Sequence, residues 1–132
     1  MYTFIEKIPP VDDFLRLRKV SGLTPRPRAA AEKALPNSLY GVYVKTGEQI
    51  VGMGRVVGDG ALNFEIVDVA VDPDHQGEGL GRGIIEKIMN YLENHAPKGS
   101  MISLMADVPG FYEKFGFQYM RPGSEGMYRV QK

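Results

Sequence analysis

The chain has 132 residues, which fits one domain spanning residues 1–132. Its 16 basic and 16 acidic side chains balance, so no global charge attracts it to nucleic acid or to an anionic membrane. The absence of cysteine excludes disulfides, cysteine–zinc sites and thiol nucleophiles. No apolar run approaches the ~20 residues of a membrane span and no secretion signal is visible, so we expect a cytoplasmic protein.

The first third of the chain predicts one strand and two helices. Residues 2–5 form a short apolar run that is typical of a strand. Residues 11–20 carry apolar side chains at helical spacing, after Pro9-Pro10 and before Gly22. A brief helix over residues 29–35 is expected to end at Pro36.

In the middle of the chain, the pattern of apolar residues changes from helical spacing to segments typical of strands. Three segments, residues 39–44, 50–57 and 61–71, are rich in Val, Ile, Tyr and Phe. They are separated by the turn signals Thr46-Gly47-Glu48 and Gly58-Asp59-Gly60. This pattern predicts an antiparallel meander.

The last third returns to a helix and then to short elements. An apolar stripe at helical spacing predicts a helix over residues 80–91, which Pro97 and Gly99 follow. The remaining elements are expected to be a strand over 101–105, a short helix over 109–115, and a closing pair of strands over 117–120 and 127–130. The whole chain therefore predicts an α+β domain with a mixed, mostly antiparallel sheet flanked by helices.

The most informative segment is a glycine-rich turn between a strand and the long helix. It reads Gln76-Gly-Glu-Gly-Leu-Gly81 and leads directly into the helix. Alternating glycines allow positive φ angles, so consecutive backbone amides can converge on one point. The helix start adds unsatisfied N–H groups and a partial positive charge. These features together predict a pyrophosphate cradle.

Two common phosphate-binding motifs do not fit this turn. A Walker loop needs Gly-Lys-Ser or Gly-Lys-Thr, whereas Gly81 is followed by Arg82-Gly83. A dinucleotide fingerprint fails because Arg82 and Ile84 occupy positions that require small residues. The turn instead matches Gln/Arg-x-x-Gly-x-Gly/Ala through Gln76, Gly79 and Gly81. It resembles the coenzyme A loop of the GNAT superfamily of N-acetyltransferases.

A second motif supports the resemblance. Members of that superfamily often carry Phe-Tyr-x-x-x-Gly-Phe on a short helix downstream, and residues 111–117 read Phe-Tyr-Glu-Lys-Phe-Gly-Phe. The resemblance covers roughly residues 38–130 and implies a GNAT-like fold. It also implies an enzyme that transfers the acetyl group of acetyl-CoA, its co-substrate, to a primary amine, without a metal and without a covalent acyl-enzyme.

The resemblance assigns a set of residues to acetyl-CoA. The strand before the loop is expected to bulge and to expose backbone N–H groups to the pantetheine and thioester. Asp107 stands where many relatives carry an asparagine. The expected cofactor-binding residues are Val69, Ala70, Val71, Gln76, Gly77, Glu78, Gly79, Leu80, Gly81 and Arg82.

Two acids on the strand before the loop are candidates for the general base. An alkylamine with a pKa near ~10.4 is almost fully protonated at neutral pH, so a proton acceptor accelerates its attack. Glu65 matches the catalytic glutamate of the histone-acetylating members of the superfamily. Asp68 lies closer to the expected thioester site and could instead orient the acceptor's ammonium. Each carboxylate could equally be a solvated side chain on the face of a strand.

Tyr112 is the candidate general acid. Members of the superfamily commonly place a tyrosine here, beside the sulfur of the leaving thiolate. Without that context, a tyrosine on an apolar helix face is more often a packing residue.

The acceptor is expected near the loop that follows the first helix. Four arginines, at positions 16, 18, 26 and 28, could recognise an anionic group on the acceptor, although a solvated basic loop is the simpler account. The short chain favours a small-molecule acceptor. Another acyl chain, a homodimer, and a non-catalytic acyl-CoA sensor that kept only the binding loop are alternatives that the sequence leaves open.

Overall fold

The computed structural model describes all residues, 1–132. Three α-helices and five strands carry the fold, and no helix is both long and apolar enough to cross a membrane. The helices are α1 (Val11–Val20), α2 (Arg28–Ala34) and α3 (Leu80–His95). The strands are β1 (Thr3–Ile5), β2 (Tyr40–Thr46), β3 (Gln49–Gly58), β4 (Asn63–Val71) and β5 (Met101–Leu104), with 3-10 turns over Leu35–Asn37, Pro73–His75 and Tyr112–Phe115.

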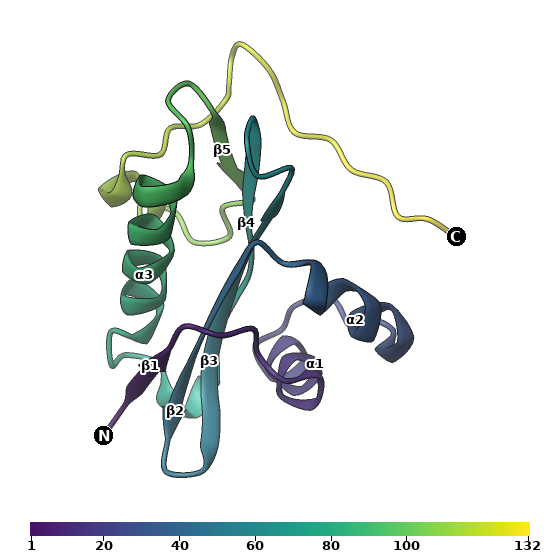
Figure 1. Ribbon diagram of the computed structural model, residues 1–132, viewed down its shortest axis with the longest axis vertical. Coiled ribbons are helices and arrows are strands. Elements are labelled where there is room, and N and C mark those ends of the chain that lie inside the picture. Colours follow the sequence, from purple (N-terminus) through teal and green to yellow (C-terminus); the bar gives the residue numbers. More distant parts are fainter.

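The five strands form one sheet in the order β1-β2-β3-β4-β5. The first four pair antiparallel: short turns join β2 to β3 and β3 to β4, whereas α1 and α2 lie between β1 and β2. Strands β4 and β5 pair parallel and are connected by the crossover helix α3. Helix α3 covers one face of the sheet, and α1 and α2 lie on the other face (Figure 1). This confirms the predicted α+β fold with a mixed, mostly antiparallel sheet.

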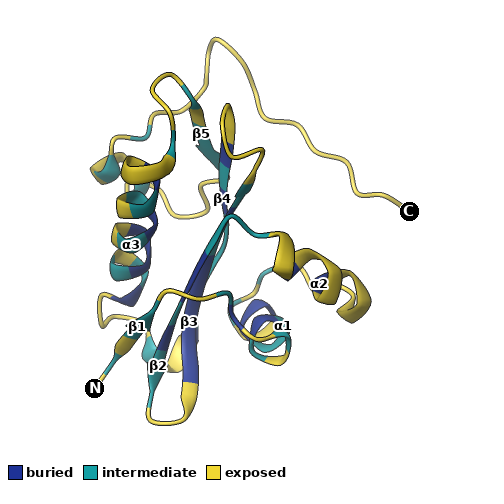
Figure 2. Ribbon diagram, in the orientation of Figure 1, coloured by how far each residue is buried: buried dark blue, intermediate teal, exposed yellow.

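Each face of the sheet has its own apolar cluster. On the α3 face, the helix buries Leu80, Ile84, Ile85, Ile88 and Leu92 against side chains of β2, β3 and β4. On the other face, Phe14 and Leu17 of α1 pack with Ile50, Met53 and Ala70. Figure 2 shows the buried stretch of the sheet where β3 passes between the two helical layers.

Two glycines bring α3 close to the sheet. A Cβ at Gly54 of β3 would lie 2.7 Å from Cγ2 of Ile84, and a Cβ at Gly83 would lie 2.4 Å from the ring of Phe4 on β1. Contacts this short leave no room for a methyl group. The start of α3, which carries the glycine-rich turn, is therefore held against the sheet at a fixed depth.

Most of the predicted elements are confirmed, and the closing pair of strands is wrong. Helix α1 has the predicted bounds, and the strands agree within a few residues. Residues 117–120 and 127–130 form no strand. Their alternating apolar pattern suits a strand, but a strand requires a neighbour for its backbone groups, and neither segment has one within this chain.

Candidate functional site

Strand β4 is interrupted by a bulge at Asp68. Arg55 of β3 pairs with Val67 and Met53 pairs with Ala70, so two residues of β4 face the single residue Gly54. Asp68 has φ +58°, the only positive φ outside glycine. An aspartate tolerates this left-handed conformation better than a branched residue does. The expected bulge is therefore confirmed, and it lies where the resemblance located it.

Beyond the bulge, β4 and β5 separate. Their pairing runs from Asn63–Met101 to Ile66–Leu104 and stops there. The amide of Asp72 donates to the carbonyl of Val51 over 2.8 Å, toward β3. Because successive amides of a strand alternate between its two edges, the amides of Val71 and Val69 are directed to the opposite edge, which β5 has left.

The glycine-rich turn presents a run of unpaired amides. Gly77 and Gly79 adopt φ values of +84° and +77°, and Gly79 precedes α3 without any side-chain cap. None of the backbone amides from residues 77 to 82 donates to another backbone group of the chain. Because helix starts carry partial positive charge, this turn can receive an anionic group.

The end of β4, the glycine-rich turn and the segment that follows β5 line one cavity of about 450 Å³. Phe111 packs over the start of α3, since a Cβ at Gly81 would lie 4.0 Å from its ring. Of the residues expected to bind acetyl-CoA, only Glu78 is not in the wall. The wall is formed by Val69, Ala70, Val71, His75, Gln76, Gly77, Gly79, Leu80, Gly81, Arg82, Asp107, Val108, Phe111 and Tyr112.

Tyr112 lies at the inner end of this cavity, in the 3-10 turn that follows β5. Its ring packs edge-on against those of Phe111 and Phe117. Burial raises the pKa of the Tyr112 hydroxyl above its usual value near ~10, and the negative charge of Asp107 raises it further. The hydroxyl therefore keeps its proton at neutral pH and can act as a donor.

Glu65 and Asp68 both lie on the α1–α2 side of the sheet, but their surroundings differ. Glu65 alternates with Phe64 and Ile66, which are buried on the α3 face. It is half-buried, pairs through the backbone with Val57 and Ser103, and takes part in no ion pair. Its carboxylate remains available to a proton.

Asp68 is engaged by two guanidinium groups. Arg55 donates from Nε to Oδ2 over 2.7 Å, and Arg18 donates from Nη1 to Oδ1. All three side chains are about nine-tenths buried or more. Burial lowers the pKa of the Arg18 guanidinium, and the charge of Asp68 opposes that effect. This ion triad joins α1, β3 and the bulge of β4.

The four arginines of the first helix and its loop are mostly engaged within the chain. Arg16 contacts Asp72 at 3.1 Å, Arg18 contacts Asp68, and Arg28 contacts Asp12. Of the four, only Arg26 lacks an ion pair with a carboxylate of the chain. Arg18 is buried against Asp68, so it is not free to receive an anionic acceptor.

Sequence reasoning does not predict two wall residues of the cavity or one long-range contact beside it. Val108 and Phe111 line the cavity, and Phe111 enters the sequence analysis only as the first residue of the Phe-Tyr motif. His75, also in the wall, is held by the Tyr2 hydroxyl, whose oxygen lies 2.9 Å from Nδ1. No local pattern relates residues 2 and 75, so only the folded chain brings Tyr2, next to the first strand, to the glycine-rich turn.

A parallel strand pair that separates at a bulge, beside an uncapped glycine-rich helix start, defines the fold class of acyl-CoA-dependent N-acyltransferases. Residues 37–119 match the family model described as an acetyltransferase (GNAT) domain. The chain belongs to the GNAT family of N-acetyltransferases.

Individual relatives agree with this assignment. A probable acetyltransferase of unknown function from Staphylococcus aureus is 42% identical, with a TM-score of 0.93 over 99% of this chain and 100% of that one. The chloroplastic GCN5-related N-acetyltransferase 2 of Arabidopsis thaliana is 40% identical over 64% of this chain and 33% of its own length. The chloroplastic serotonin N-acetyltransferase 2 of rice is 40% identical over 58% of this chain and 38% of its own length. The chain thus spans less than half the length of these two curated relatives.

Proposed function

We propose that this chain binds acetyl-CoA in the cavity between β4 and the glycine-rich turn and transfers its acetyl group to a primary amine. The observation that carries the proposal is the run of unpaired amides over residues 77–82, which opens on the cavity that also contains Tyr112. In this proposal the amides and Arg82 receive the pyrophosphate. The amides of Val69 and Val71 receive the pantetheine and polarise the thioester carbonyl.

The transfer proceeds directly between the two substrates. The amine lone pair attacks the thioester carbon, a C–N bond forms, and the C–S bond breaks. Glu65 takes the proton that the amine loses, and Tyr112 gives its proton to the departing thiolate. The unpaired carboxylate of Glu65, and the protonated hydroxyl of Tyr112 in the cavity wall, support these two roles.

Asp68 receives a different role in this proposal. Each of its carboxylate oxygens already accepts from a guanidinium, so we assign it to holding the bulge rather than to proton transfer. The bulge in turn sets the direction of the Val69 amide. Asp68 therefore acts through the backbone of its own strand.

The acceptor in this proposal is a small primary amine that approaches from the α1–α2 side of β4, where Glu65 points. The name of the rice relative makes arylalkylamines such as serotonin the first acceptors to try. Aliphatic diamines, amino sugars and lysine peptides complete the set. Because Arg16, Arg18 and Arg28 have internal partners, we expect no preference for strongly anionic amines.

Calorimetric titration with acetyl-CoA, followed by free-thiol release against this set of amines, tests the proposal. Saturable binding together with thiol release on one class of amine is the expected result. Binding without release on any amine would favour the non-catalytic sensor. Absence of binding at millimolar acetyl-CoA would overturn the proposal. Parallel titrations with succinyl-CoA and propionyl-CoA measure the preference for the acyl chain.

A further inference from the structure

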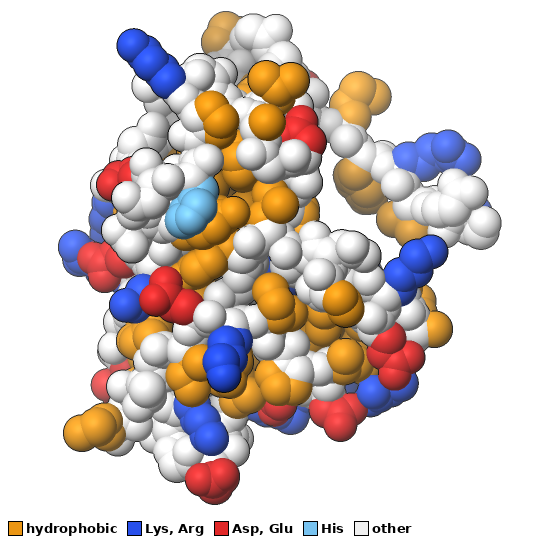
Figure 3. All heavy atoms as spheres, in the orientation of Figure 1, with side chains coloured by type: hydrophobic (Ala, Val, Ile, Leu, Met, Phe, Trp, Pro, Cys, Tyr) orange, Lys and Arg blue, Asp and Glu red, His pale blue; other side chains and the backbone are white.

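Acetyl-CoA is a polyanion, and this chain offers it no excess of positive charge. The chain has 16 basic and 16 acidic side chains, and the two kinds are interspersed over the face drawn in Figure 3. Arg82 is the only Lys or Arg side chain in the wall of the cavity at the glycine-rich turn, and its Nε already lies 3.5 Å from a carboxylate oxygen of Glu86. Another donor in this wall would therefore strengthen the binding of phosphate.

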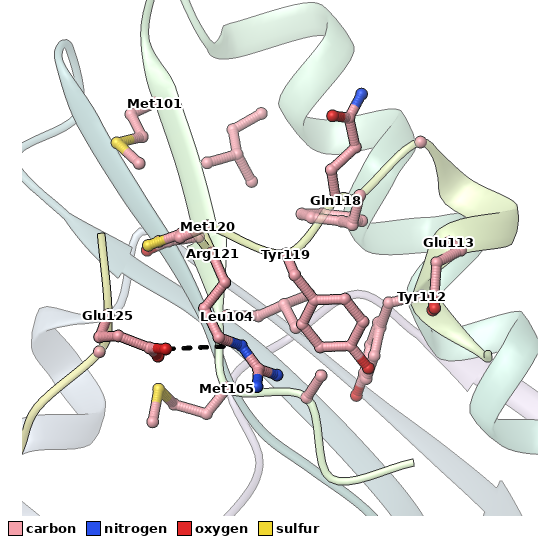
Figure 4. Close-up of a pocket in the computed structure, with 16 residues that line it drawn as sticks. Met101, Leu104, Met105, Tyr112, Glu113, Gln118, Tyr119, Met120, Arg121 and Glu125 are labelled. Atoms are coloured by element: carbon pink, nitrogen blue, oxygen red, sulfur yellow. Dashed lines mark ion pairs between the residues drawn. The ribbon is translucent and has the colours of Figure 1, made fainter. Parts of the chain in front are cut away.

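The larger cavity of the molecule, of about 480 Å³, is poorly suited to a phosphate group. It lies between β5 and residues 116–121, and nine of its sixteen lining residues are hydrophobic. Its only basic side chain, Arg121, lies 3.7 Å from Glu125, and the dashed line in Figure 4 marks this ion pair. The phosphate groups of the cofactor are therefore expected at the glycine-rich turn and not here.

Strand β1 and the residue before it hold both ends of the glycine-rich turn. At the far end, the ring of Phe4 lies so close to Gly83 that a Cβ there would collide with it. At the near end, the Tyr2 hydroxyl oxygen lies 2.9 Å from Nδ1 of His75, and the two rings meet edge-on with their centroids 5.8 Å apart. Both Tyr2 and Phe4 also pack against the apolar cluster on the α3 face. The imidazole of His75 is therefore fixed from the first strand.

The backbone around His75 is fixed as well. His75 ends the 3-10 turn Pro73–His75, and its amide donates to the carbonyl of Asp72 over 2.8 Å. The carboxylate of Asp72 accepts from the amide of Asp74 over 3.0 Å and from Arg16 of α1 over 3.1 Å. These contacts hold His75 in the cavity wall whether or not a ligand is bound.

The two nitrogens of the His75 ring differ in their surroundings. Nδ1 faces the Tyr2 hydroxyl, whereas Nε2 forms no hydrogen bond within the chain. In a neutral imidazole one nitrogen donates and the other accepts, and the partner of one nitrogen decides which of them carries the proton. If the hydroxyl donates to Nδ1, Nε2 becomes a donor on the other side of the ring.

We propose that the Tyr2 hydroxyl donates to Nδ1 of His75 and thereby keeps the imidazole proton on Nε2, and that this Nε2–H donates to a phosphate oxygen of acetyl-CoA. His75 is then a binding residue, and Tyr2 is a positioning residue that acts through it. The proposal rests on the proposed function, because the phosphate belongs to acetyl-CoA. The pyrophosphate and the ribose 3′-phosphate offer the same acceptor chemistry, and truncation of the cofactor distinguishes them.

The position of the imidazole proton can be measured without a ligand. The chain has two histidines, so nitrogen-15 spectra of the labelled rings contain two sets of signals, and His95→Gln assigns them. His95 is an internal reference of the opposite kind, because its Nδ1 lies 2.9 Å from the carbonyl oxygen of Tyr91, which can only accept. At about pH 9, where an ordinary imidazole is neutral, His75 is expected to be protonated at Nε2 and His95 at Nδ1.

Tyr2→Phe keeps the ring and removes the hydroxyl. The Nδ1 signal of His75 is expected to move in this variant, because the nitrogen loses its hydrogen-bond donor, whereas the His95 signals stay in place. A His75 ring protonated at Nδ1 in the natural chain, or His75 signals that do not change in Tyr2→Phe, would overturn the proposal.

Calorimetric titration with acetyl-CoA tests the second half of the proposal. His75→Leu is expected to raise the Kd about 10-fold, because a hydrogen bond to a charged acceptor is lost. His75→Gln keeps an N–H at a similar reach and is expected to stay within about 3-fold of the natural Kd. Tyr2→Phe is expected to raise the Kd about 3-fold in the natural chain and to have no effect beside His75→Gln, whose amide has no tautomer. His95→Gln, outside the cavity, is the matched control.

Titration with 3′-dephospho-CoA, which keeps the pyrophosphate, identifies the phosphate. A loss of affinity in His75→Leu that persists with this ligand locates the contact at the pyrophosphate, and a loss that vanishes locates it at the 3′-phosphate. Equal affinities of the natural chain and His75→Leu for acetyl-CoA, or equal losses in His75→Leu and His75→Gln, would overturn the role of His75 alone. Failure of the natural chain to bind acetyl-CoA would overturn the proposed function together with it.

Discussion

Arg55 donates a hydrogen bond from Nε to Oδ2 of Asp68 over 2.7 Å, and this contact joins β3 to the bulge of β4. Arg18 of α1 contacts the other oxygen of the same carboxylate. The helix that is expected to cover the acceptor and the strand that is expected to hold the thioester are thereby connected through one buried charge.

Asp68→Asn is expected to lower the free energy of unfolding by about 3 kcal/mol, because it leaves two buried guanidiniums without a counter-charge. Asparagine keeps the shape of the side chain and tolerates the positive φ, so the lost stability is due to removal of the negative charge. For a chain of this size the change corresponds to roughly 10 °C in Tm. Thermal unfolding followed by circular dichroism measures it.

The matched control is Asp12→Asn, which removes the partner of Arg28 at the surface. Both side chains of that pair are more than half exposed, so its loss is expected to change Tm far less than Asp68→Asn does. Equal Tm values for the two variants would contradict a structural role for the buried triad.

Tyr112→Phe is expected to lower kcat for thiol release roughly 100-fold, because it removes the proton donor and keeps the ring. The matched control is Tyr119→Phe, which removes a hydroxyl from the neighbouring exposed tyrosine. An unchanged kcat in Tyr112→Phe would remove this residue from the proton transfer.

The pH profile of kcat gives a separate test of the same hydroxyl. Because burial and Asp107 raise the pKa of Tyr112, its proton is retained below the ordinary tyrosine value near ~10 and is lost only above it. We therefore expect the natural chain to lose activity on the alkaline side above about pH 10, and this limb to disappear in Tyr112→Phe. An alkaline limb that persists in the variant belongs to another group.

Glu65→Gln is expected to lower the rate at neutral pH roughly 100-fold, since the acceptor amine then loses its proton without an enzyme base. The remaining rate should rise with pH as the fraction of neutral amine grows. Glu48→Gln, in the exposed turn between β2 and β3, controls for loss of one negative charge. A Glu65→Gln profile that overlays the natural one across pH excludes the base role.

Gly79→Ala is expected to weaken acetyl-CoA binding roughly 10-fold, because a left-handed residue with a Cβ costs about 1–2 kcal/mol and the turn relaxes away from its bound shape. Gly99→Ala is the control. It also has a positive φ, +88°, and an added Cβ there likewise meets nothing within 4 Å, but it lies outside the cavity. Calorimetry should give a changed Kd for the first variant only.

The sequence by itself determined the elements whose causes are local. Helix α1 follows from the spacing of its apolar side chains, and the shape of the glycine-rich turn follows from glycines that adopt positive φ. The bulged strand and Tyr112 are predicted only through the resemblance to the motifs of one family. Their convergence on one cavity agrees with that reading.

Only the tertiary structure decided the contacts between distant segments. Arg18, Arg55 and Asp68 are separated along the chain by 37 and 13 residues, so no periodicity could pair them. The strands predicted from the pattern of residues 117–120 and 127–130 are wrong, because a strand depends on a neighbour that hydrogen-bonds its backbone. The local sequence pattern determines on which face of a helix or strand a side chain lies, whereas the tertiary fold determines which distant segment packs against that face.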